Sequence, residues 1–566
     1  MNSETKTCQN CKRSFIIEPE DFEFYEKMKV PPPTWCPECR MVRRLLFSNQ
    51  RSLYIRNCNL CGRRSMSMYP EDKDLVVYCP ECWWSSKWNG DDYAMDYDLS
   101  RPFLEQFREL IKKTPQVGLA TSHTTLVNSD YVNDAAYSKD CYLIFWADYC
   151  DNVMYSSLLA NDKDSADCHI LEESELCYGN LNCQKCYRVF FSEDCQNCEN
   201  VYFSKNCIGC SNVIGCINLR NQKYMIENTQ YTREDYEQKL RELDFSSRKN
   251  IENYKKCACA FWATQPHKYM HGYQNKNVTG DYVRESKNSF DMYQVVAAED
   301  CKHCIHISLP ATKDAHDYSG WGNNAELMWD SAICGENVRN LRFCYNCFPN
   351  CSDMEYCVHT SSSHDMFGCT NIKQQQYCIL NKPYSKEEFE RLRAQIVEDM
   401  NAHPYVDAQG RAYLYGEFMP PDLSLFGYNE SRAQDYFPIT EDIAQMRGYH
   451  WYHGKVERPA PTMKREAIPD RIQEASNDIL KEILECSSCG RSYKIISNEL
   501  ELLRRFELPV PNKCPDCRHK ERWARMTPPL LWKRMCAKCG KDIQTSYAPE
   551  RPEIVYCEQC FQAEVA

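Results

Sequence analysis

Residues 8–40, CQNCKRSFIIEPEDFEFYEKMKVPPPTWCPECR, have a counterpart at residues 486–518, CSSCGRSYKIISNELELLRRFELPVPNKCPDCR. Each stretch carries two pairs of cysteines with two residues inside each pair, and the second stretch lies 478 residues after the first without a gap. Two more such pairs follow each stretch at the same displacement. This match over eight cysteines indicates that a tandem module was duplicated and now occurs near both ends of the sequence.

The paired cysteines are typical of metal ligands. Two cysteines separated by two residues form a tight turn that directs both sulfurs at one ion, and two such pairs complete the tetrahedral thiolate shell that structural zinc prefers. We therefore expect four closed, structural Zn²⁺ sites, and a four-cysteine iron–sulfur cluster stays open as the alternative. The predicted ligands are Cys8, Cys11, Cys36, Cys39, Cys58, Cys61, Cys79, Cys82, Cys486, Cys489, Cys514, Cys517, Cys536, Cys539, Cys557 and Cys560.

The composition predicts a cytoplasmic protein built from several domains. At 566 residues the chain is too long for one core, and 38 cysteines without a secretion signal indicate reduced thiols rather than disulfides. No apolar run is long enough to cross a bilayer, so we expect no membrane partner. The net charge of −12 is uneven, because residues 1–82 and 486–566 carry +2 and +4 and leave −18 for the middle.

The first stretch, CQNCKRSFIIEPEDFEFYEKMKVPPPTWCPECRMVRR, resembles the zinc-ribbon family of treble-clef type. In that family a cysteine knuckle, a short acidic helical segment and a CPxCR knuckle that opens a basic helix follow in order. The second copy is similar, although Lys12 stands in the first copy where the second keeps the usual glycine, Gly490. The whole chain also resembles cysteine-rich zinc-binding proteins of candidate-phylum bacteria. The resemblance implies an architecture and zinc, and no activity.

A second duplication lies between the two modules. CINLRNQKYMIENTQYTREDYEQKL, from Cys216, matches CTNIKQQQYCILNKPYSKEEFERL, from Cys369, at a displacement of 153 residues. Cysteines recur nine residues apart, and short aromatic and β-branched runs lie between Asn, Asp and Gly turn signals. We therefore expect two β-solenoid halves, with about two nine-residue steps per coil, in which neighbouring coils bury one another.

Two interpretations fit the central cysteines. A ladder of inward-facing thiols is the simpler one, because cysteine is small and often buried. Additional zinc is the alternative, since pairs such as Cys183 and Cys186 keep the spacing of metal ligands. The candidates for an open, non-structural site are His303, His306 and His316.

Capping signals predict a helix at the end of each half, after Thr232 and after Ser385. Further helices are expected near residues 101–112 and 470–484. The predicted fold class is multidomain and β-rich (α+β), with terminal double zinc ribbons that flank a duplicated β-solenoid-like centre with short capping helices. The predicted domains are 1–90 (double zinc ribbon), 91–124 (helical connector), 125–245 (first half with its capping helix), 246–274 (linker), 275–397 (second half with its capping helix), 398–485 (linker and helix) and 486–566 (double zinc ribbon).

Basic residues on and after the predicted ribbon helices indicate a first function. Their side chains can neutralise phosphates while nearby aromatic rings stack on unpaired bases, so the terminal modules are predicted to bind RNA or DNA. The alternatives are a solvated helix face, or a basic surface docked on the acidic centre of the same protein. The candidate residues are Arg40, Arg43, Arg44, Arg56, Arg518, Lys520, Arg522 and Arg525.

A protein-interaction scaffold is the second predicted function. In it zinc is purely structural, and the acidic, tyrosine-rich centre contacts protein partners. An enzyme that uses the solenoid surface is the third. The sequence has no phosphate-binding loop, nucleophile elbow or HExxH signature, and we predict no catalytic residue.

Overall fold

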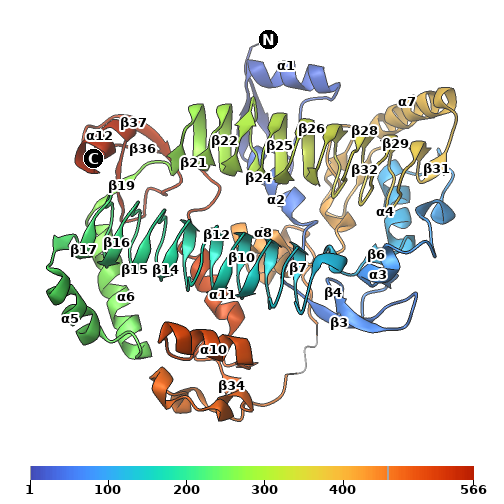
Figure 1. Cartoon of the computed structure of the whole chain (residues 1–566). Coiled ribbons are helices and arrows are strands. Elements are labelled where there is room, and N and C mark those ends of the chain that lie inside the picture. The colour runs from blue at the N-terminus through green and yellow to red at the C-terminus, as the bar shows by residue number, and fades with distance from the viewer. Residues whose placement is uncertain (1, 455–457, 566) are drawn as a thin grey trace.

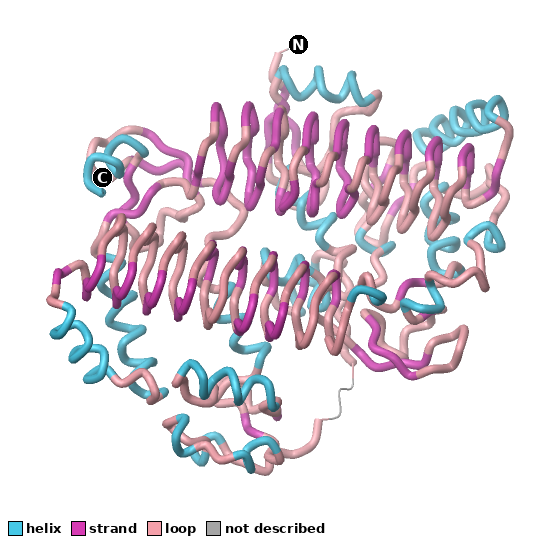
Figure 2. Tube along the Cα trace, in the orientation of Figure 1, coloured by secondary structure: helices cyan, strands magenta, loops and turns pink. Residues whose placement is uncertain are grey.

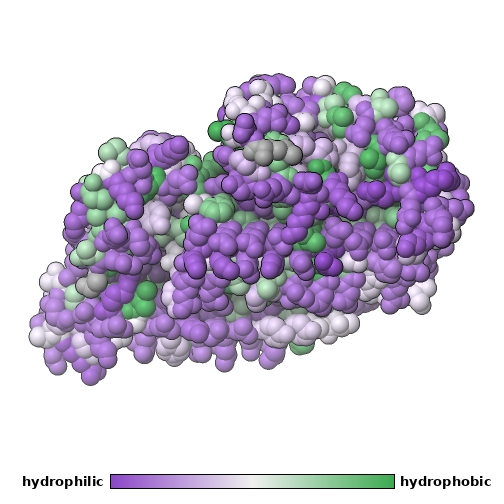
Figure 3. Space-filling view, turned by 90° about the horizontal axis from the view of Figure 1, so that it is seen from above, coloured by the Kyte–Doolittle hydropathy of each residue, from purple (hydrophilic) through white to green (hydrophobic). Residues whose placement is uncertain are grey.

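Two stacks of short parallel strands lie side by side and form the centre of the molecule (Figures 1 and 2). The computed structural model describes residues 2–454 and 458–565. We call residues 121–230 the first stack and residues 272–383 the second stack. The two stacks touch, since the ring of Trp146 in the first meets His306 in the second with centroids 4.3 Å apart. The face seen in Figure 3 is mostly hydrophilic, with hydrophobic residues in small groups.

Each turn of the chain in the first stack, which we call a rung, contains the same number of residues. Ser157 pairs with Phe145 on one side and with His169 on the other, so each parallel strand lies 12 residues after its neighbour. A short antiparallel strand, β18, closes the end. The strands are β7 (Asn133–Ala136), β8 (Phe145–Asp148), β9 (Asp151–Met154), β10 (Ser157–Ala160), β11 (Lys163–Ala166), β12 (His169–Glu172), β13 (Leu181–Gln184), β14 (Tyr187–Phe190), β15 (Glu199–Tyr202), β16 (Ser211–Ile214), β17 (Lys223–Ile226) and β18 (Thr229–Gln230).

The second stack is one 12-stranded sheet whose rungs vary in length. Lys287 pairs with Glu299 and Thr312 with Ala325, which are steps of 12 and 13 residues. It also ends on a short antiparallel strand, β31. The strands are β20 (Gly272–Tyr273), β21 (Lys276–Arg284), β22 (Lys287–Val296), β23 (Ala298–Glu299), β24 (Ile305–Leu309), β25 (Thr312–Gly322), β26 (Ala325–Gly335), β27 (Val338–Arg342), β28 (Ser352–Glu355), β29 (His364–Phe367), β30 (Gln376–Ile379) and β31 (Lys382–Pro383).

A three-residue repeat explains the 12-residue rung. In the first stack Cys177, Asn180, Cys183 and Cys186 are buried in turn, and a residue with positive φ follows each inward position two residues later. Asn and Asp accept the left-handed conformation better than most residues, which accounts for their frequency there. The expected coil of two nine-residue steps is therefore wrong. Each 12-residue rung has four sides of three residues, so the nine-residue spacing of the cysteines covers three sides of one rung.

Side-chain ladders connect successive rungs. Asn152 donates from Nδ2 to Oδ1 of Asp164 over 2.7 Å, and the backbone N–H of Cys168 donates to Oγ of Ser156 over 2.9 Å. Both bonds span 12 residues, so they join equivalent positions on neighbouring rungs. Polar groups at these positions are thus satisfied inside the stack rather than by water.

Helices lie at the stack ends and faces, as the capping signals predicted. Tyr236 of α5 packs on Tyr224 at the end of the first stack, and Phe389 of α7 packs on Tyr377 at the end of the second. The connecting elements are α4 (Phe103–Lys113), β6 (Gln116–Val117), α5 (Arg233–Leu243), α6 (Arg248–Ala263), β19 (Pro266–Lys268), α7 (Lys386–Ala402), β32 (Tyr405–Val406), β33 (Ala412–Tyr413), α8 (Arg432–Tyr436) and α9 (Glu441–Met446).

The segment predicted as linker and helix, residues 398–485, is built differently. Tyr413 and Tyr428 are almost fully buried, so its first part packs into the protein core. The helix expected near residues 470–484 is wrong, because three-residue and four-residue 3₁₀ turns stand there. Asp470 accepts hydrogen bonds from Ser247 and the backbone of Lys249, which ties this segment to the start of α6 instead.

The two terminal modules contain the same elements in the same order. The first comprises β1 (Glu4–Thr7), β2 (Ser14–Ile17), α1 (Pro19–Met28), α2 (Pro37–Leu45), β3 (Tyr54–Asn57), β4 (Arg64–Ser67), β5 (Val77–Tyr78) and α3 (Pro80–Trp83). The second comprises β34 (Leu484–Glu485), β35 (Ser492–Tyr493), α10 (Ser497–Phe506), α11 (Pro515–Trp523), β36 (Trp532–Met535), β37 (Asp542–Thr545), β38 (Ile554–Tyr556) and α12 (Glu558–Val565).

Candidate metal centres

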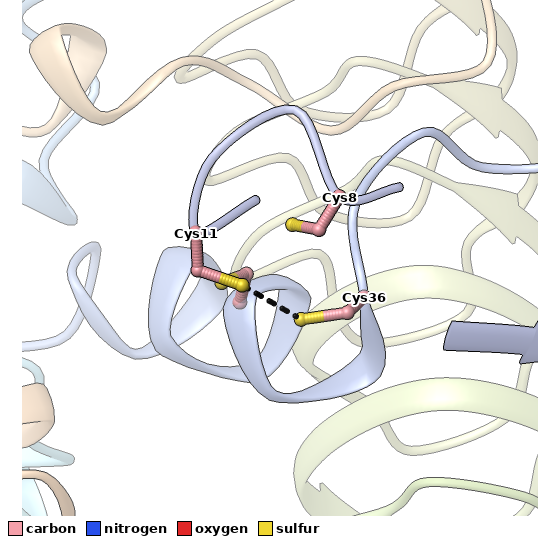
Figure 4. A group of neighbouring side chains, drawn as sticks. Cys8, Cys11 and Cys36 are labelled. Atoms are coloured by element: carbon pink, nitrogen blue, oxygen red, sulfur yellow. Dashed lines mark hydrogen bonds between the residues drawn. The ribbon is translucent and has the colours of Figure 1, made fainter. Parts of the chain in front are cut away.

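All sixteen predicted cysteines come together in four groups of four. Within each group the sulfurs lie within 4.8 Å of one another, which is close enough to share one ion. Figure 4 shows Cys8, Cys11 and Cys36 directed at one another, with the sulfurs of Cys11 and Cys36 3.7 Å apart. The groups are Cys8, Cys11, Cys36 and Cys39; Cys58, Cys61, Cys79 and Cys82; Cys486, Cys489, Cys514 and Cys517; and Cys536, Cys539, Cys557 and Cys560.

A tight turn positions the first pair of ligands in each group. The N–H of Gly490 donates to the carbonyl of Cys486 over 2.9 Å, and Gly490 adopts a φ of +70°. Lys12 makes the same bond to Cys8 and adopts a φ of 62°, so the first module keeps this turn without a glycine. The left-handed conformation costs a lysine roughly 1 kcal/mol more than a glycine.

A helix start positions the second pair. Cys36 precedes the first residue of α2, which is Pro37, and Cys514 stands in the same place before α11. Free N–H groups at a helix start stabilise negative charge, and thiolates are the form of cysteine that binds metal. The ligand pairs thus belong to rigid local structures, as their spacing predicted.

Backbone donors also favour the thiolate form at the first cysteine of three groups. The N–H of Cys514 lies 3.2 Å from the sulfur of Cys486. Burial raises the pKa of Cys486, but the backbone N–H groups of Cys514 and Cys489 lower it to about 7. Similar donors bring the pKa of Cys58 to about 7 and that of Cys536 to about 6. Each of these groups can therefore supply one ionised ligand near neutral pH.

The central cysteines do not form comparable groups. Within residues 2–454 and 458–565, they join no set of three or more ligand atoms that lie within 4.8 Å of one another. The thiol of Cys183 instead donates to the carbonyl of Leu181, and that of Cys195 to Glu193, each over 3.4 Å. Only a protonated thiol donates such a bond. The ladder of inward-facing thiols is therefore the arrangement that this part of the chain contains.

The three candidate histidines do not converge either. His316 stacks on Phe24 of α1 with ring centroids 3.7 Å apart, whereas His306 meets Trp146 of the first stack. His303 lies beside Asp291, with 3.4 Å between Nδ1 and the carboxylate. Burial lowers the pKa of His316 to about 3 and also lowers that of His306. These side chains pack between elements as neutral rings.

The arginines of α2 are buried against carboxylates of the second stack. Arg40, Arg43 and Arg44 are at most 2% exposed. Arg40 lies 2.6 Å from Asp317, and Arg44 lies 2.7 Å from Asp330. Arg43 contacts Asp330 at 2.9 Å and Glu417 at 3.0 Å, and its guanidinium lies 4.5 Å from the ring of Trp35.

The equivalent helix of the second module, α11, is buried on the first stack. Arg518 and Arg522 both pair with Asp167, and Arg525 lies 3.1 Å from Glu193. Arg518 also lies 3.1 Å from Glu499 on α10 of its own module. The basic surface of each terminal module therefore faces an acidic surface of the centre.

These ion pairs keep buried carboxylates charged. Burial raises the pKa of Asp317, but Arg40 and Arg44 outweigh burial and hold that pKa below its usual range. Arg518 and Arg522 do the same for Asp167. Since an unpaired buried charge costs several kcal/mol, neither partner tolerates loss of the other.

The exposed basic surface predicted for the modules is wrong for these arginines. Arg56 is also buried and donates to the carbonyls of Pro70 and Leu75, whereas Lys520 is exposed. Docking on the acidic centre, which the sequence left as an alternative, is the arrangement that the structure contains. The sequence missed the acceptors Asp167, Asp317, Asp330 and Glu417, because nothing distinguishes them from the other acids of the centre.

Each module contacts both stacks. The first holds the second stack through α2, its strand β5 pairs with β6 immediately before the first stack, and Asn133 of β7 donates to the backbone carbonyl of Asn49. The second module holds the first stack through α11, its strand β38 pairs with β19 immediately before the second stack, and its Thr527 donates to the carboxylate of Asp281 on β21. The two modules thus make equivalent contacts with opposite stacks.

The chain matches no known family model and no curated protein. In the described residues no helix is both long and apolar enough to span a bilayer.

Proposed function

We propose that the protein is a zinc-dependent scaffold in which two terminal modules hold two β-solenoids side by side. In this proposal each stack is a solenoid, each four-cysteine group is a zinc-ribbon site of treble-clef type, and the metal is structural. Four cysteine ligands complete a tetrahedral shell and leave no position for water or substrate. The zinc would therefore stabilise the fold and supply no chemistry.

The cross-bracing of the stacks is the observation that carries this proposal. The first module joins α2 to Asp317 in one stack and β5 to β6 before the other. The second module repeats both contacts with the stacks exchanged. A module that only bound nucleic acid would leave its arginines exposed, whereas a module that holds the two stacks together has to bury its arginines against them.

Metal binding and docking are linked through adjacent residues. Arg40 directly follows the ligand Cys39, and Arg518 directly follows Cys517. Each metal group organises only a few dozen residues, and modules of that size depend on their ion for folding. Loss of an ion should therefore release the helix that carries the docking arginines.

A protein is the partner that the exposed surface fits best. Tyr137 and Tyr149, at equivalent positions 12 residues apart on the first stack, are 55% and 57% exposed, and their rings are stacked with centroids 4.8 Å apart. Tyrosine is enriched where proteins contact one another, because it offers a large rigid ring with a polar end. We therefore assign partner binding to this tyrosine pair.

Hydrogen exchange on the full-length, zinc-loaded protein tests the scaffold. Replacing the ligand Cys36 with Ser should remove one metal ion and raise exchange in α2 and in the facing strands β25 and β26. The matched control is Cys257→Ser, because Cys257 is an exposed thiol outside all four groups. Unchanged exchange in α2 after loss of the ion would show that the metal is not needed to keep α2 docked on the second stack.

The same protein tests the nucleic-acid function predicted from the sequence. Binding through exposed basic residues weakens steeply between 50 and 200 mM salt. The zinc-loaded protein should show no such salt-dependent binding to a single-stranded RNA. If it does bind, and if Lys520→Glu weakens the binding while zinc is retained, nucleic-acid recognition replaces the scaffold as the function.

A further inference from the structure

An aromatic cavity of about 230 Å³ lies between the two stacks. Its wall includes Trp84 of the first module, Trp146 of the first stack, and Trp321 and Phe348 of the second stack. Trp321 and Phe348 meet edge to face with centroids 4.7 Å apart, and Trp84 is 54% exposed. Three parts of the chain that are distant in sequence thus contribute rings to one space.

Close contact between the stacks fixes one wall of this cavity. Trp146 packs against Gly320, where an added Cβ would lie 3.0 Å from the indole ring. Gly320 also has a φ of +90°, which other residues adopt only with strain. The glycine therefore allows the indole to reach across from the first stack.

Two carboxylates face the cavity and, in the described part of the chain, are not engaged in an ion pair. Asp134 lies on β7 and Asp148 on the neighbouring strand β8, and neither forms an ion pair within the described ranges. Burial raises the pKa of Asp134 to about 7, although Arg432 partly offsets this effect. A cation placed between these groups would supply the ion pair that neither carboxylate makes in the described ranges, since the nearby cations Lys373 and Arg432 lie over aromatic rings instead.

Rings in this wall already attract cations of the protein. The ammonium of Lys373 lies 4.5 Å from the centroid of Trp84, and the guanidinium of Arg432 lies 4.6 Å from that of Trp146. The face of an aromatic ring carries negative charge, and this attraction is strongest where water is excluded. The remaining titratable group of the wall is His359, whose pKa burial lowers to about 4, so that it adds no positive charge.

We propose that this cavity binds a small alkylammonium ion, held between the carboxylates of Asp134 and Asp148 and the aromatic rings around them. The carboxylates supply the counter-charge, and the rings contact the alkyl groups and attract the positive nitrogen. This site is separate from the metal groups and from the tyrosine pair, so it does not depend on the proposed scaffold function.

Titration calorimetry with two matched probes tests the site on the zinc-loaded, full-length protein. The probes are choline and 3,3-dimethylbutan-1-ol, which have the same shape and differ in charge. Choline should bind saturably with a Kd of about 1 mM or lower, and the neutral alcohol at least about tenfold more weakly. Asp134→Asn and Asp148→Asn should each weaken choline binding about tenfold or more.

The control variant is Asp130→Asn, an exposed acid of the first stack that does not line the cavity. It should bind choline with unchanged affinity, and metal content and melting temperature should show that all variants are folded. Equal affinity for choline and the neutral alcohol would overturn the proposal, since it would mean that only apolar contact matters. Absence of saturable choline binding would overturn it as well.

Discussion

The guanidinium of Arg40 lies 2.6 Å from the carboxylate of Asp317, although 277 residues separate them along the chain. Arg518 occupies the same place in the second module and pairs with Asp167 in the other stack. The duplicated module thus uses the same arginine twice, each time to hold a different half of the duplicated centre. Both halves and both modules are needed for this arrangement, so the molecule is expected to unfold with strong coupling between its ends.

Breaking one buried pair should cost far more than breaking an exposed pair. Arg44→Ala leaves Asp317 and Asp330 without one of their buried partners, and the expected loss in the free energy of unfolding is about 3–5 kcal/mol. The matched control is Arg233→Ala, since Arg233 pairs with Glu237 on the exposed face of α5 and its loss should change the free energy of unfolding far less. Urea unfolding measures both, and similar losses would contradict a docking role for α2.

Metal stoichiometry should follow the four groups. The purified, reduced protein should contain four ions, and Cys61→Ser should contain three because one ligand of the second group is lost. Cys257 is exposed like Cys61 but belongs to no group, so Cys257→Ser should keep four ions. Elemental analysis measures the content and identifies the metal. Four ions in both variants would mean that the second ion is not bound by the group that contains Cys61.

Stability should depend on pH through Asp134. The pKa of this carboxyl is raised from 3.8 to about 7 in the folded chain, so the folded state holds a proton that the unfolded state releases. Stability therefore falls as pH rises from about 4 to 7. Asp134→Asn removes this dependence. The free energy of unfolding of the variant, relative to that of the unchanged protein, should therefore increase by about 1 kcal/mol between pH 6 and pH 8. Urea unfolding at both pH values measures the difference, and an equal difference at the two would contradict the raised pKa.

Left-handed positions in the stacks should reject β-branched residues. Asn152 has a φ of 53° and donates to Asp164 on the next rung. Asn152→Gly loses only that bond, whereas Asn152→Val also forces a branched side chain into the left-handed conformation at an added cost of about 1–2 kcal/mol. Thermal or urea unfolding compares the two. Equal stability of both variants would mean that the three-residue repeat does not constrain the backbone there.

The spacing of the cysteines was enough to predict the metal groups. The sulfurs of Cys8 and Cys11 come close enough to share one ion because the turn between them is two residues long, and such a turn has few conformations. The helices after Thr232 and Ser385 were predictable for the same reason, since a cap and the first turn of a helix involve only neighbouring residues. Local geometry therefore carried these predictions.

The length of the rung was harder to predict. Successive inward positions such as Cys177, Asn180 and Cys183 differ in residue type, so the three-residue period is hidden and only a nine-residue rhythm of cysteines is visible. The rung becomes evident from the pairing of residues 12 apart, such as Ser157 and His169. The length of the rung is set by backbone hydrogen bonding, which any residue type can make, so the residue types do not reveal it.

The amino-acid sequence by itself determined the sixteen ligands, the two duplications and the capped helices, because each depends on residues close together in the chain. Only the tertiary structure decided what the arginines do. A guanidinium binds a phosphate or a carboxylate equally well, and its neighbours in sequence do not say which one it will meet. For Arg40 and Arg518 the answer lies in Asp317 and Asp167, hundreds of residues away, where burial makes a paired carboxylate the partner.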